Sequence, residues 1–377
     1  MPDGVRADNG PDTTIILRPE SHQMSNITAA TDVDVALVRE SLPLHLKALA
    51  FSGKYGTIVV LVGMTLAFFI AAPTTFGSPG NLTAVLTNLA PGAIVAIGLT
   101  IVLVAGDFDL SVGYQASIAG VFVVGLLSGL GFLGVTAGGS PDGTVGWPLW
   151  VAIPVILVIG CFFGLINGLV VTKLGVNALV GTLGTGTIIF AFNLLYGNGV
   201  TYAVRDDGSF LRLSLSKLFG VIPYPIIILV FFIIGSWLLL NMTKFGQHLK
   251  AVGDDAEAAR RLGINVSRTR ILAFMFTGFC GTAGGILLAS SLGSGDANAG
   301  DVYLLQAFAA AFLGSAALRD GEFHIVGTIL GVLTVAIGFN GLAIFSAPAF
   351  TQYLFAGGLL VVAVALSTMS RKYVSEL

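Results

Sequence analysis

The sequence predicts an all-α polytopic membrane protein with about ten transmembrane helices and one short cytoplasmic helix. Of its 377 residues, 55% are hydrophobic and only 10% are charged, whereas soluble domains carry roughly 25% charged residues. Too few charged side chains remain to cover a folded surface in water. The net charge of −2 gives no reason to expect a nucleic-acid partner. The lipid bilayer is therefore the expected environment of this chain.

Residues 1–50 differ from the rest of the chain. Aspartates and prolines interrupt this segment before any long apolar run begins. It also lacks the basic stretch and apolar core of a signal peptide. We therefore expect a largely disordered cytoplasmic tail over residues 1–50, in which residues 36–51 are able to form a short helix on the membrane surface. The membrane permease domain is expected over residues 51–377.

Ten apolar runs approach the roughly 20 residues that a helix needs to cross the hydrocarbon core. None alternates with the period of two that is typical of a barrel strand. The runs cover residues 57–76, 83–104, 110–134, 148–171, 178–196, 223–241, 270–292, 303–318, 325–345 and 350–369. The fifth and the eighth are the weakest. Glycines at four-residue spacing, such as Gly160, Gly164 and Gly168, predict close helix packing.

The distribution of lysine and arginine predicts the orientation. With ten membrane crossings, both ends lie on one side, together with the connections after the second, fourth, sixth and eighth crossings. Fifteen of the 18 basic residues fall on that side, and only Arg205, Arg212 and Lys217 fall on the other. Because lysine and arginine concentrate in cytoplasmic loops, both termini and the 242–269 loop are expected in the cytoplasm. An odd number of crossings would place basic loops on both sides.

The second run contains Pro91 and Gly92 shortly after Asn88. Proline removes a backbone donor and clashes with the preceding turn, so this helix is expected to be kinked or interrupted near its middle. A plain kink is the commoner consequence. The alternative is a place on a solute path, because broken helices often line one.

Two carboxylates, Asp107 and Asp109, lie between the second and third runs, within residues 106–113. Asp109 and Ser111 are suited to cap the following helix by accepting its free backbone N–H groups. A carboxylate within a bilayer is costly and is usually functional. Capping and a place on a path for hydroxyl-bearing solutes both remain open.

The 242–269 loop contains a short helix whose two ends are marked in the sequence. Asp255 is the expected N-cap, Glu257 favours the positive end, Arg260 and Arg261 favour the negative end, and Gly263 supplies a left-handed stop. Isolated helices shorter than about 12 residues are marginal in water. This one is therefore expected to form against a partner surface.

The sequence contains no recognisable catalytic, nucleotide-binding or metal-binding motif. No phosphate-binding G-x-x-x-x-G-K-[ST] motif occurs, and the only Gly-Lys pair, at Gly53 and Lys54, is followed by tyrosine. The histidines lack metal-ligand spacing, and Cys161 and Cys280 are expected to be small buried hydrophobes. We therefore expect no catalytic residues and no cofactor or metal bound by this chain. If ATP drives its action, another subunit hydrolyses it.

Four segments in order resemble the ribose/xylose-type sugar permeases of ATP-binding-cassette importers. They are residues 106–113, 167–174 with 182–184, 253–264, and 327–342. The chain departs from the family pattern at Asp107, where the family has a second glycine, and at Phe108, where isoleucine is usual. Asp255 replaces an asparagine, and residues 320–322 are more acidic than in the family.

The resemblance implies a permease of the bacterial inner membrane that forms a dimer, docks two nucleotide-binding ATPase subunits and receives sugar from an extracytoplasmic binding protein. ATP and Mg would be held by the partner subunits. The solute would be a pentose, deoxysugar, hexose or polyol. The expected coupling residues are Gly253, Asp255, Glu257, Ala258, Arg260 and Gly263. The expected solute-path residues are Asn88, Asp107, Asp109, Ser111 and Asn340.

Alternatives stay open at this point. Within the same class, a permease for branched-chain amino acids or nucleosides is the nearest rival. Outside it, an ion-coupled secondary transporter would use Asp107 and Asp109 as its coupling groups. An intramembrane enzyme is a more distant possibility. The sequence does not identify the sugar, or whether the second permease chain is identical or a paralogue.

Overall fold

A computed structural model describes residues 44–129, 146–197, 201–205, 208–316 and 321–375. Its contacts form two units, residues 1–50 and 51–377. Of the first unit, only the start of one helix is described, so the predicted tail lies almost entirely outside the described residues. The account below concerns the second unit.

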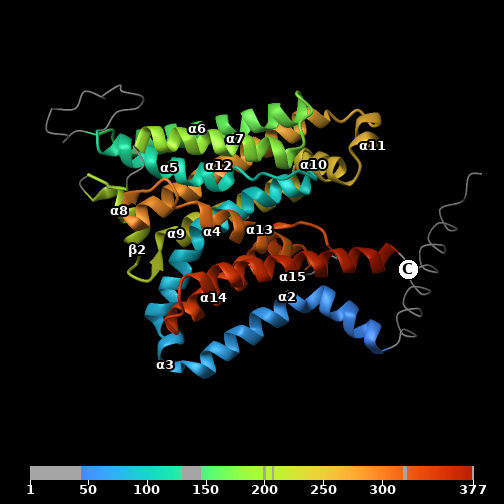
Figure 1. The fold of residues 1–377 in the computed structure, drawn as a ribbon, viewed down its shortest axis with the longest axis horizontal. Helices are drawn as coiled ribbons and strands as arrows, with labels where there is room; N and C mark the ends of the chain where they lie inside the picture. The colour runs from blue at the N-terminus through green and yellow to red at the C-terminus, as the bar shows by residue number, and fades with distance from the viewer. Residues whose placement is uncertain (1–43, 130–145, 198–200, 206–207, 317–320, 376–377) are drawn as a thin grey trace, which may run out of the picture. The chain divides into compact units, whose positions relative to one another are not determined.

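The described residues are almost entirely helical, which confirms the predicted all-α class (Figure 1). The helices are α2 (Leu44–Ala71), α3 (Pro73–Phe76), α4 (Pro79–Val104), α5 (Val112–Leu127), α6 (Leu149–Thr172), α7 (Ala178–Gly197), α8 (Ser209–Leu215), α9 (Tyr224–Met242), α10 (Lys244–Asp254), α11 (Ala256–Arg261), α12 (Val266–Leu292), α13 (Asp301–Ala316), α14 (Ile325–Ile344) and α15 (Phe350–Ser375). The same described ranges contain four two-residue strands, which form two antiparallel pairs. β1 (Tyr202–Ala203) pairs with β4 (Ser294–Gly295), and β2 (Lys217–Leu218) pairs with β3 (Ile222–Pro223).

The predicted apolar runs all appear as helices. Within the part of the chain that the structure describes, six helices are long and apolar enough to cross a membrane, namely α4, α6, α7, α9, α12 and α14. Shorter apolar helices cover Tyr55–Ala71, Val112–Leu127, Asp301–Ala316 and Phe350–Ala365. Together they match the ten predicted runs one for one. The chain is a multi-pass membrane protein.

Helix α4 runs without a break through Pro91. Figure 1 shows that it changes direction along its length, as expected where proline removes a backbone hydrogen bond. Of the two outcomes predicted for Pro91 and Gly92, the structure has the bend and not the interruption. A Cβ at Gly92 would lie 2.9 Å from the ring of Tyr303. Glycine here therefore allows α13 to approach the bend.

The chain is interrupted instead just before two short helices. Helices α5 and α13 have 16 residues each, which gives a length of about 24 Å, short of the roughly 30 Å of a hydrocarbon core. Each follows a long helix through a stretch of mostly irregular backbone. We call residues 105–111 the first re-entrant segment and residues 293–300 the second. Helix α5 ends at Leu127 and is shorter than the crossing predicted over residues 110–134, of which residues 130–134 lie outside the described residues.

The starts of α5 and α13 lie against each other. A Cβ at Gly113 would lie 3.1 Å from the carbonyl oxygen of Gly300, and the Gly300 N–H donates to the Ser117 hydroxyl over 2.8 Å. Gly281, near the middle of α12, packs against Val112. The two short helices thus begin level with the middle of a long one. This is the depth at which irregular backbone must be enclosed by protein or line a cavity.

The two halves of the unit repeat one pattern. Helices α4 to α7 and helices α12 to α15 each comprise a long helix, a re-entrant segment, a 16-residue helix and two further helices. Internal repeats of this kind are typical of transporters, whose solute sites lie where the repeats meet. The repeat was not predicted from the sequence.

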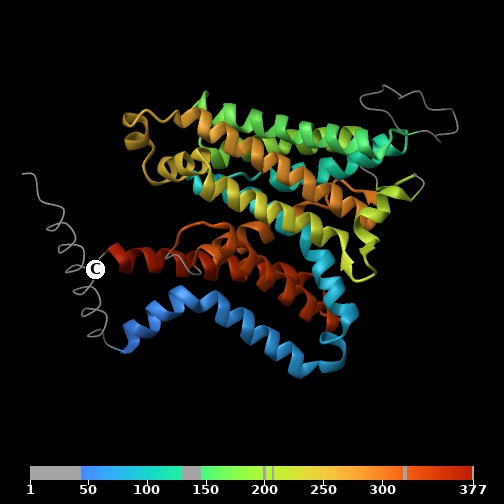
Figure 2. The same ribbon diagram turned by 180° about the vertical axis from the view of Figure 1, so that it is seen from behind.

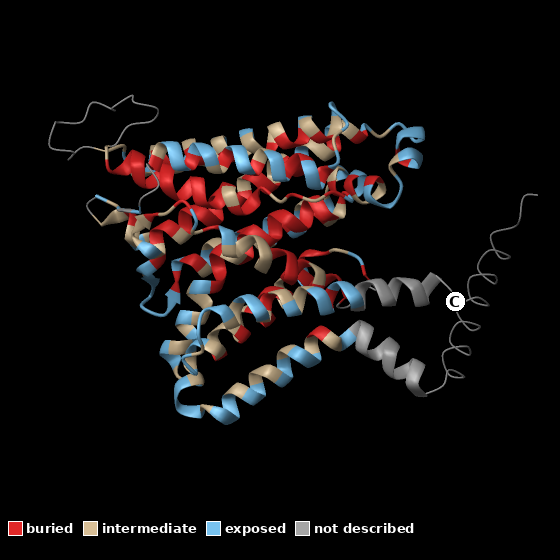
Figure 3. Cartoon of the chain, viewed as in Figure 1, coloured by how far each residue is buried: buried red, intermediate tan, exposed pale blue. Residues whose placement is uncertain are grey.

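Close glycine packing joins the halves, as predicted. Helix α6 lies on α12, and Cβ atoms at Gly160, Gly164 and Gly168 would overlap Thr282, Phe274 and Ile271 respectively. Figure 3 shows buried residues concentrated in α4, α5 and α12, whereas α11 is largely exposed. In Figure 2, α10 and α11 lie at the opposite end of the helices from the β2–β3 pair. The structure therefore has a packed centre and an exposed helix at one end.

Candidate solute cavity and coupling helix

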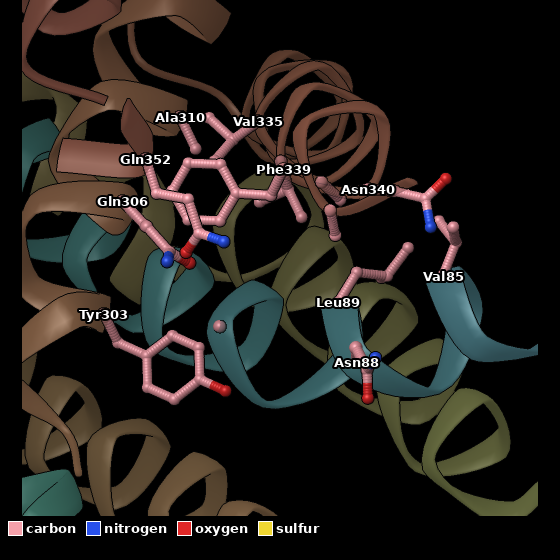
Figure 4. Close-up of a pocket in the computed structure, with 14 residues that line it drawn as sticks. Val85, Asn88, Leu89, Tyr303, Gln306, Ala310, Val335, Phe339, Asn340 and Gln352 are labelled. Carbon is pink, nitrogen blue, oxygen red and sulfur yellow. The ribbon is translucent and has the colours of Figure 1, made fainter. Parts of the chain in front are cut away.

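A cavity of about 300 Å³ lies between α4, α13, α14 and α15 (Figure 4). Its lining combines apolar and neutral polar side chains. The polar ones are Asn88, Tyr303, Gln306, Asn340 and Gln352. Among the described residues that line it, none is charged. The cavity is therefore suited to a neutral solute with several hydroxyl groups, which amide and phenol groups can hydrogen-bond.

Helix α13 brings one polar face to this cavity. Tyr303, Gln306 and Ala310 are three and four residues apart, so they lie on the same side of the helix. The Tyr303 ring packs at Gly92, at the bend of α4. In Figure 4 Tyr303 and Gln306 extend from α13 toward the bend. The second re-entrant segment and the Pro91 bend together create this arrangement.

Asn340 also has a structural role. Its amide nitrogen donates to Asn81 Oδ1 over 2.7 Å, and Asn81 Nδ2 donates back to Asn340 Oδ1 over 3.0 Å. This reciprocal pair ties the end of α14 to the start of α4. Asn340 therefore holds the cavity wall as well as lining it. Asn88 is exposed to the cavity.

Asp109 and Ser111 do not line the cavity. Both are fully buried, and Asp109 Oδ1 accepts from the Ser111 N–H at 2.9 Å and from its hydroxyl at 2.6 Å. Asn167 Nδ2 on α6 donates to the Ser111 hydroxyl over 2.7 Å. Thr182 on α7 accepts from the Leu110 N–H over 3.0 Å. Ser111 is the N-cap residue of α5, but its side chain accepts no backbone N–H of that helix. Asp109 bonds to Ser111 itself and so fixes the turn before α5, which means that the predicted side-chain capping is wrong.

Sequence reasoning missed the partners in this network. Asn167 and Thr182 are both fully buried and belong to the segments that carry the family resemblance, but they received no role. Gln115, also fully buried, donates to the Ser111 hydroxyl over 2.6 Å. The signal was available, because an uncharged polar residue inside an apolar run needs a partner in lipid.

Asp107 forms an ion pair with Arg270 on α12. The Nε and Nη2 groups of Arg270 donate to the two carboxylate oxygens. The Asp107 side chain is 3% exposed and that of Arg270 is 28% exposed. Nearby, a Cβ at Gly253 would overlap the carbonyl oxygen of Val104, so the end of α10 touches the end of α4. The first re-entrant segment therefore lies beside the 242–269 loop.

The short helix predicted in that loop is confirmed as α11. Asp255 caps it, because its Oδ1 accepts from the Glu257 and Ala258 N–H groups at 2.9 and 3.0 Å. Gly263 ends it at φ +84°. Arg260 pairs with Glu257 over 2.7 Å. Leu262, just after the helix, is 81% exposed, a large apolar side chain available to a partner surface.

Gly253 lies in α10, ahead of the short helix, which begins at Ala256 after its Asp255 cap. The structure thus separates the expected path residues into two groups. Asn88 and Asn340 meet at the cavity, whereas Asp107, Asp109 and Ser111 meet at the first re-entrant segment. Sequence reasoning missed Tyr303, Gln306 and Gln352, the first two of which fall in the weak eighth run.

Comparisons with known proteins found one matching family model and several similar proteins. The family model described as "Branched-chain amino acid transport system / permease component" matches residues 81–364. The galactose/methyl galactoside import permease protein of Escherichia coli (strain K12) is 30% identical over 84% of this chain and 94% of its own. The ribose import permease protein of Bacillus subtilis (strain 168) is 31% identical over 87% and 97%. The L-arabinose transport system permease protein of Escherichia coli (strain K12) is 31% identical over 85% and 92%. No solved structure was found to match.

Proposed function

This chain belongs to the permease-component family of transport systems, and on that premise we propose that it carries a neutral monosaccharide or polyol into the cytoplasm. It would do so as the membrane subunit of an ATP-binding-cassette importer. The relatives are named for galactose, ribose and arabinose, which are neutral and rich in hydroxyl groups. The chain itself would perform no covalent chemistry.

The observation that carries this proposal is the chemistry of the cavity. Amide groups of Asn88, Gln306 and Gln352 and the phenol of Tyr303 offer both donors and acceptors. The rings of Tyr303 and Phe339 add apolar surface against which a sugar ring can pack. Such a lining recognises hydroxyl groups without requiring charge.

The same chemistry disfavours an amino acid. A zwitterion brings a carboxylate and an ammonium group, and burying either without a partner is costly. No charged residue is among the described lining. The first turn of α13, whose positive end would otherwise attract a carboxylate, begins with Asp301. This aspartate opposes anion binding there.

An ion-coupled mechanism also receives little support. Its candidate groups were Asp107 and Asp109, and neither lines the cavity. Asp107 is engaged by Arg270, and Asp109 is bonded to the backbone and hydroxyl of Ser111. Their geometry favours structural roles over ion exchange with solvent.

The proposed partners follow from α11 and from the family. We infer that α11 docks a nucleotide-binding subunit that holds ATP and Mg, and that a second permease chain and an extracytoplasmic sugar-binding protein complete the importer. Both termini and the 242–269 loop would be cytoplasmic, in the bacterial inner membrane. An exposed helix of six residues with an exposed leucine after it supports docking, because so short a helix gains stability from a partner.

Uptake by the reconstituted importer tests the substrate class. Proteoliposomes with the permease, its ATPase subunit and its binding protein would be supplied with labelled pentoses, hexoses, polyols, leucine and a nucleoside. We expect ATP-dependent uptake of at least one neutral sugar or polyol. Uptake of leucine or the nucleoside alone, or uptake driven by an ion gradient without ATP, would contradict the proposal.

The docking role of α11 has its own test. Ala258→Pro removes an N–H that Asp255 accepts and disrupts the helix start. We expect ATP hydrolysis to become uncoupled from sugar uptake while the protein stays in the membrane. Ala256→Pro is the matched control, because Ala256 is the first residue of α11, where proline is tolerated and no N–H bond to Asp255 is lost. Unchanged uptake in Ala258→Pro would exclude the docking role.

A further inference from the structure

We propose that the Asp107–Arg270 ion pair is a clamp through which movement of the 242–269 loop reaches the first re-entrant segment and the contact between α5 and α13 beside the cavity. The proposal rests on the proposed function, because it concerns how ATP-driven movement is passed to the solute path. Asp107 and Arg270 are positioning residues in this scheme and touch no solute.

Two contacts flank the loop and hold the first re-entrant segment. Just before the segment, Gly253 of α10 contacts the Val104 carbonyl, where α4 finishes. Within the segment, Asp107 is bound through both oxygens by Arg270, which follows the loop in the first turns of α12. Helix α11 lies between these two points in the chain. A displacement of α11 therefore acts on the segment through both contacts.

The geometry of the pair suits it to carry such a displacement. A bidentate arginine–carboxylate contact fixes orientation as well as distance. With Asp107 nearly inaccessible to water, the interaction is screened far less than a surface pair. Leaving either charge without its partner would be costly. The two groups are thus expected to move together.

Beyond Asp107, contacts continue toward the cavity. Asp109 and Ser111 are joined by hydrogen bonds, and Ser111 immediately precedes α5. Gly113, in the first turn of α5, lies against Gly300. Tyr303, which lines the cavity, is three residues farther along α13. Each step from the clamp to the cavity is a direct contact or a stretch of a few residues.

A double-mutant cycle in the reconstituted importer tests the clamp. Asp107→Asn, Arg270→Gln and the double variant would be compared by the number of ATP molecules hydrolysed for each sugar transported. Each single variant is expected to raise this ratio by roughly five-fold, the lower end of typical coupling between sites. The double variant should resemble the singles, because both act through one interaction.

The control is Arg268→Gln, which removes an exposed arginine two residues away on α12 and should leave the ratio unchanged. If a single variant fails to assemble, Arg270→Lys replaces it, since it keeps the charge but loses the bidentate contact and should give an intermediate ratio. An unchanged ratio in the singles, or effects that simply add in the double variant, would overturn the clamp. Failure of the wild-type importer to take up any sugar would instead overturn the proposed function.

Discussion

The two re-entrant segments occupy equivalent places in the two halves of the fold but are anchored differently. The first is anchored by side chains from distant helices, namely Asn167, Thr182 and Arg270. The second is anchored by backbone pairing of β1 with β4, by Asn193, which donates to the Ala297 carbonyl over 3.0 Å, by the Ser117 hydroxyl, which accepts from the Gly300 N–H, and by the bond from Thr201 to Asp296.

Their carboxylates differ in the same way. Asp107 and Asp109 are buried, whereas Asp296 in the second segment is only partly buried and Asp301, which starts α13, is exposed. The third residue of each short helix is a tyrosine, but Tyr114 packs on Gly186 of α7 and Tyr303 lines the cavity. The comparison indicates that one segment is fixed inside the protein and that the other presents its helix to the solute. The same backbone arrangement therefore has a structural role in the first half and a solute-binding role in the second.

The largest expected effect compares the two anchoring asparagines. Asn167→Ala removes bonds to Asp109, Ser111 and Thr185 and leaves buried polar groups unpaired, which should cost about 3 kcal/mol or more. Asn193→Ala removes the bond to Ala297 and should cost about 1 kcal/mol. Thermal unfolding of each purified variant in detergent measures the difference. Equal destabilisation would remove the distinction between the segments.

The next prediction concerns the close contact of the 242–269 loop with the end of α4, beside the first re-entrant segment. Gly253→Ala places a methyl group against the Val104 carbonyl, and overpacking of this kind costs about 1–3 kcal/mol. Gly235→Ala on α9 is the matched control, because nothing lies near its added methyl group. We expect a lower unfolding temperature and weaker coupling only for Gly253→Ala. If the two variants behaved identically, the close contact between α10 and α4 at Gly253 would be contradicted.

The two tyrosines sharpen the comparison at the level of transport. Tyr303→Phe removes a hydroxyl from the cavity and should raise the KM for sugar by about three- to ten-fold, the equivalent of one neutral hydrogen bond. Tyr114→Phe should leave KM unchanged. Initial uptake rates over a range of sugar concentrations give both values. A larger change in KM for Tyr114→Phe than for Tyr303→Phe would show that the solute binds in the first half of the fold, at α5, and not in the cavity at α13.

The smallest effect concerns the exposed ion pairs of α11. The side chains of Glu257 and Arg260 are 60% and 63% exposed, and pairs of this kind contribute less than about 1 kcal/mol. Glu257→Gln should therefore leave the unfolding temperature of the isolated permease unchanged. A clear drop would show that α11 depends on this pair and not on its Asp255 cap.

Local signals were predicted well from the sequence. The Asp255 cap and the Gly263 stop depend only on neighbouring residues, and the apolar runs depend only on composition. The segment from Gly106 to Ser111 resembled a short loop, because nothing local shows that it returns to the middle of the fold. The Asp107–Arg270 pair joins residues far apart in the chain, so only the packed fold reveals it. Tyr303 and Gln306 were missed for a related reason. Their polar side chains only made the eighth apolar run look weak, and the sequence does not show that they line a cavity.

Thiol protection at the cavity tests the central claim most directly. Gln306→Cys and, as a control, Val221→Cys, at the 71% exposed turn between β2 and β3, would be made with Cys161 replaced by alanine, while Cys280 is buried. Each would be labelled with a small water-soluble maleimide during ATP-driven uptake. We predict that the transported sugar slows labelling at residue 306 and leaves labelling at residue 221 unchanged. Equal labelling of residue 306 with and without sugar, while uptake proceeds, would show that the solute takes another path.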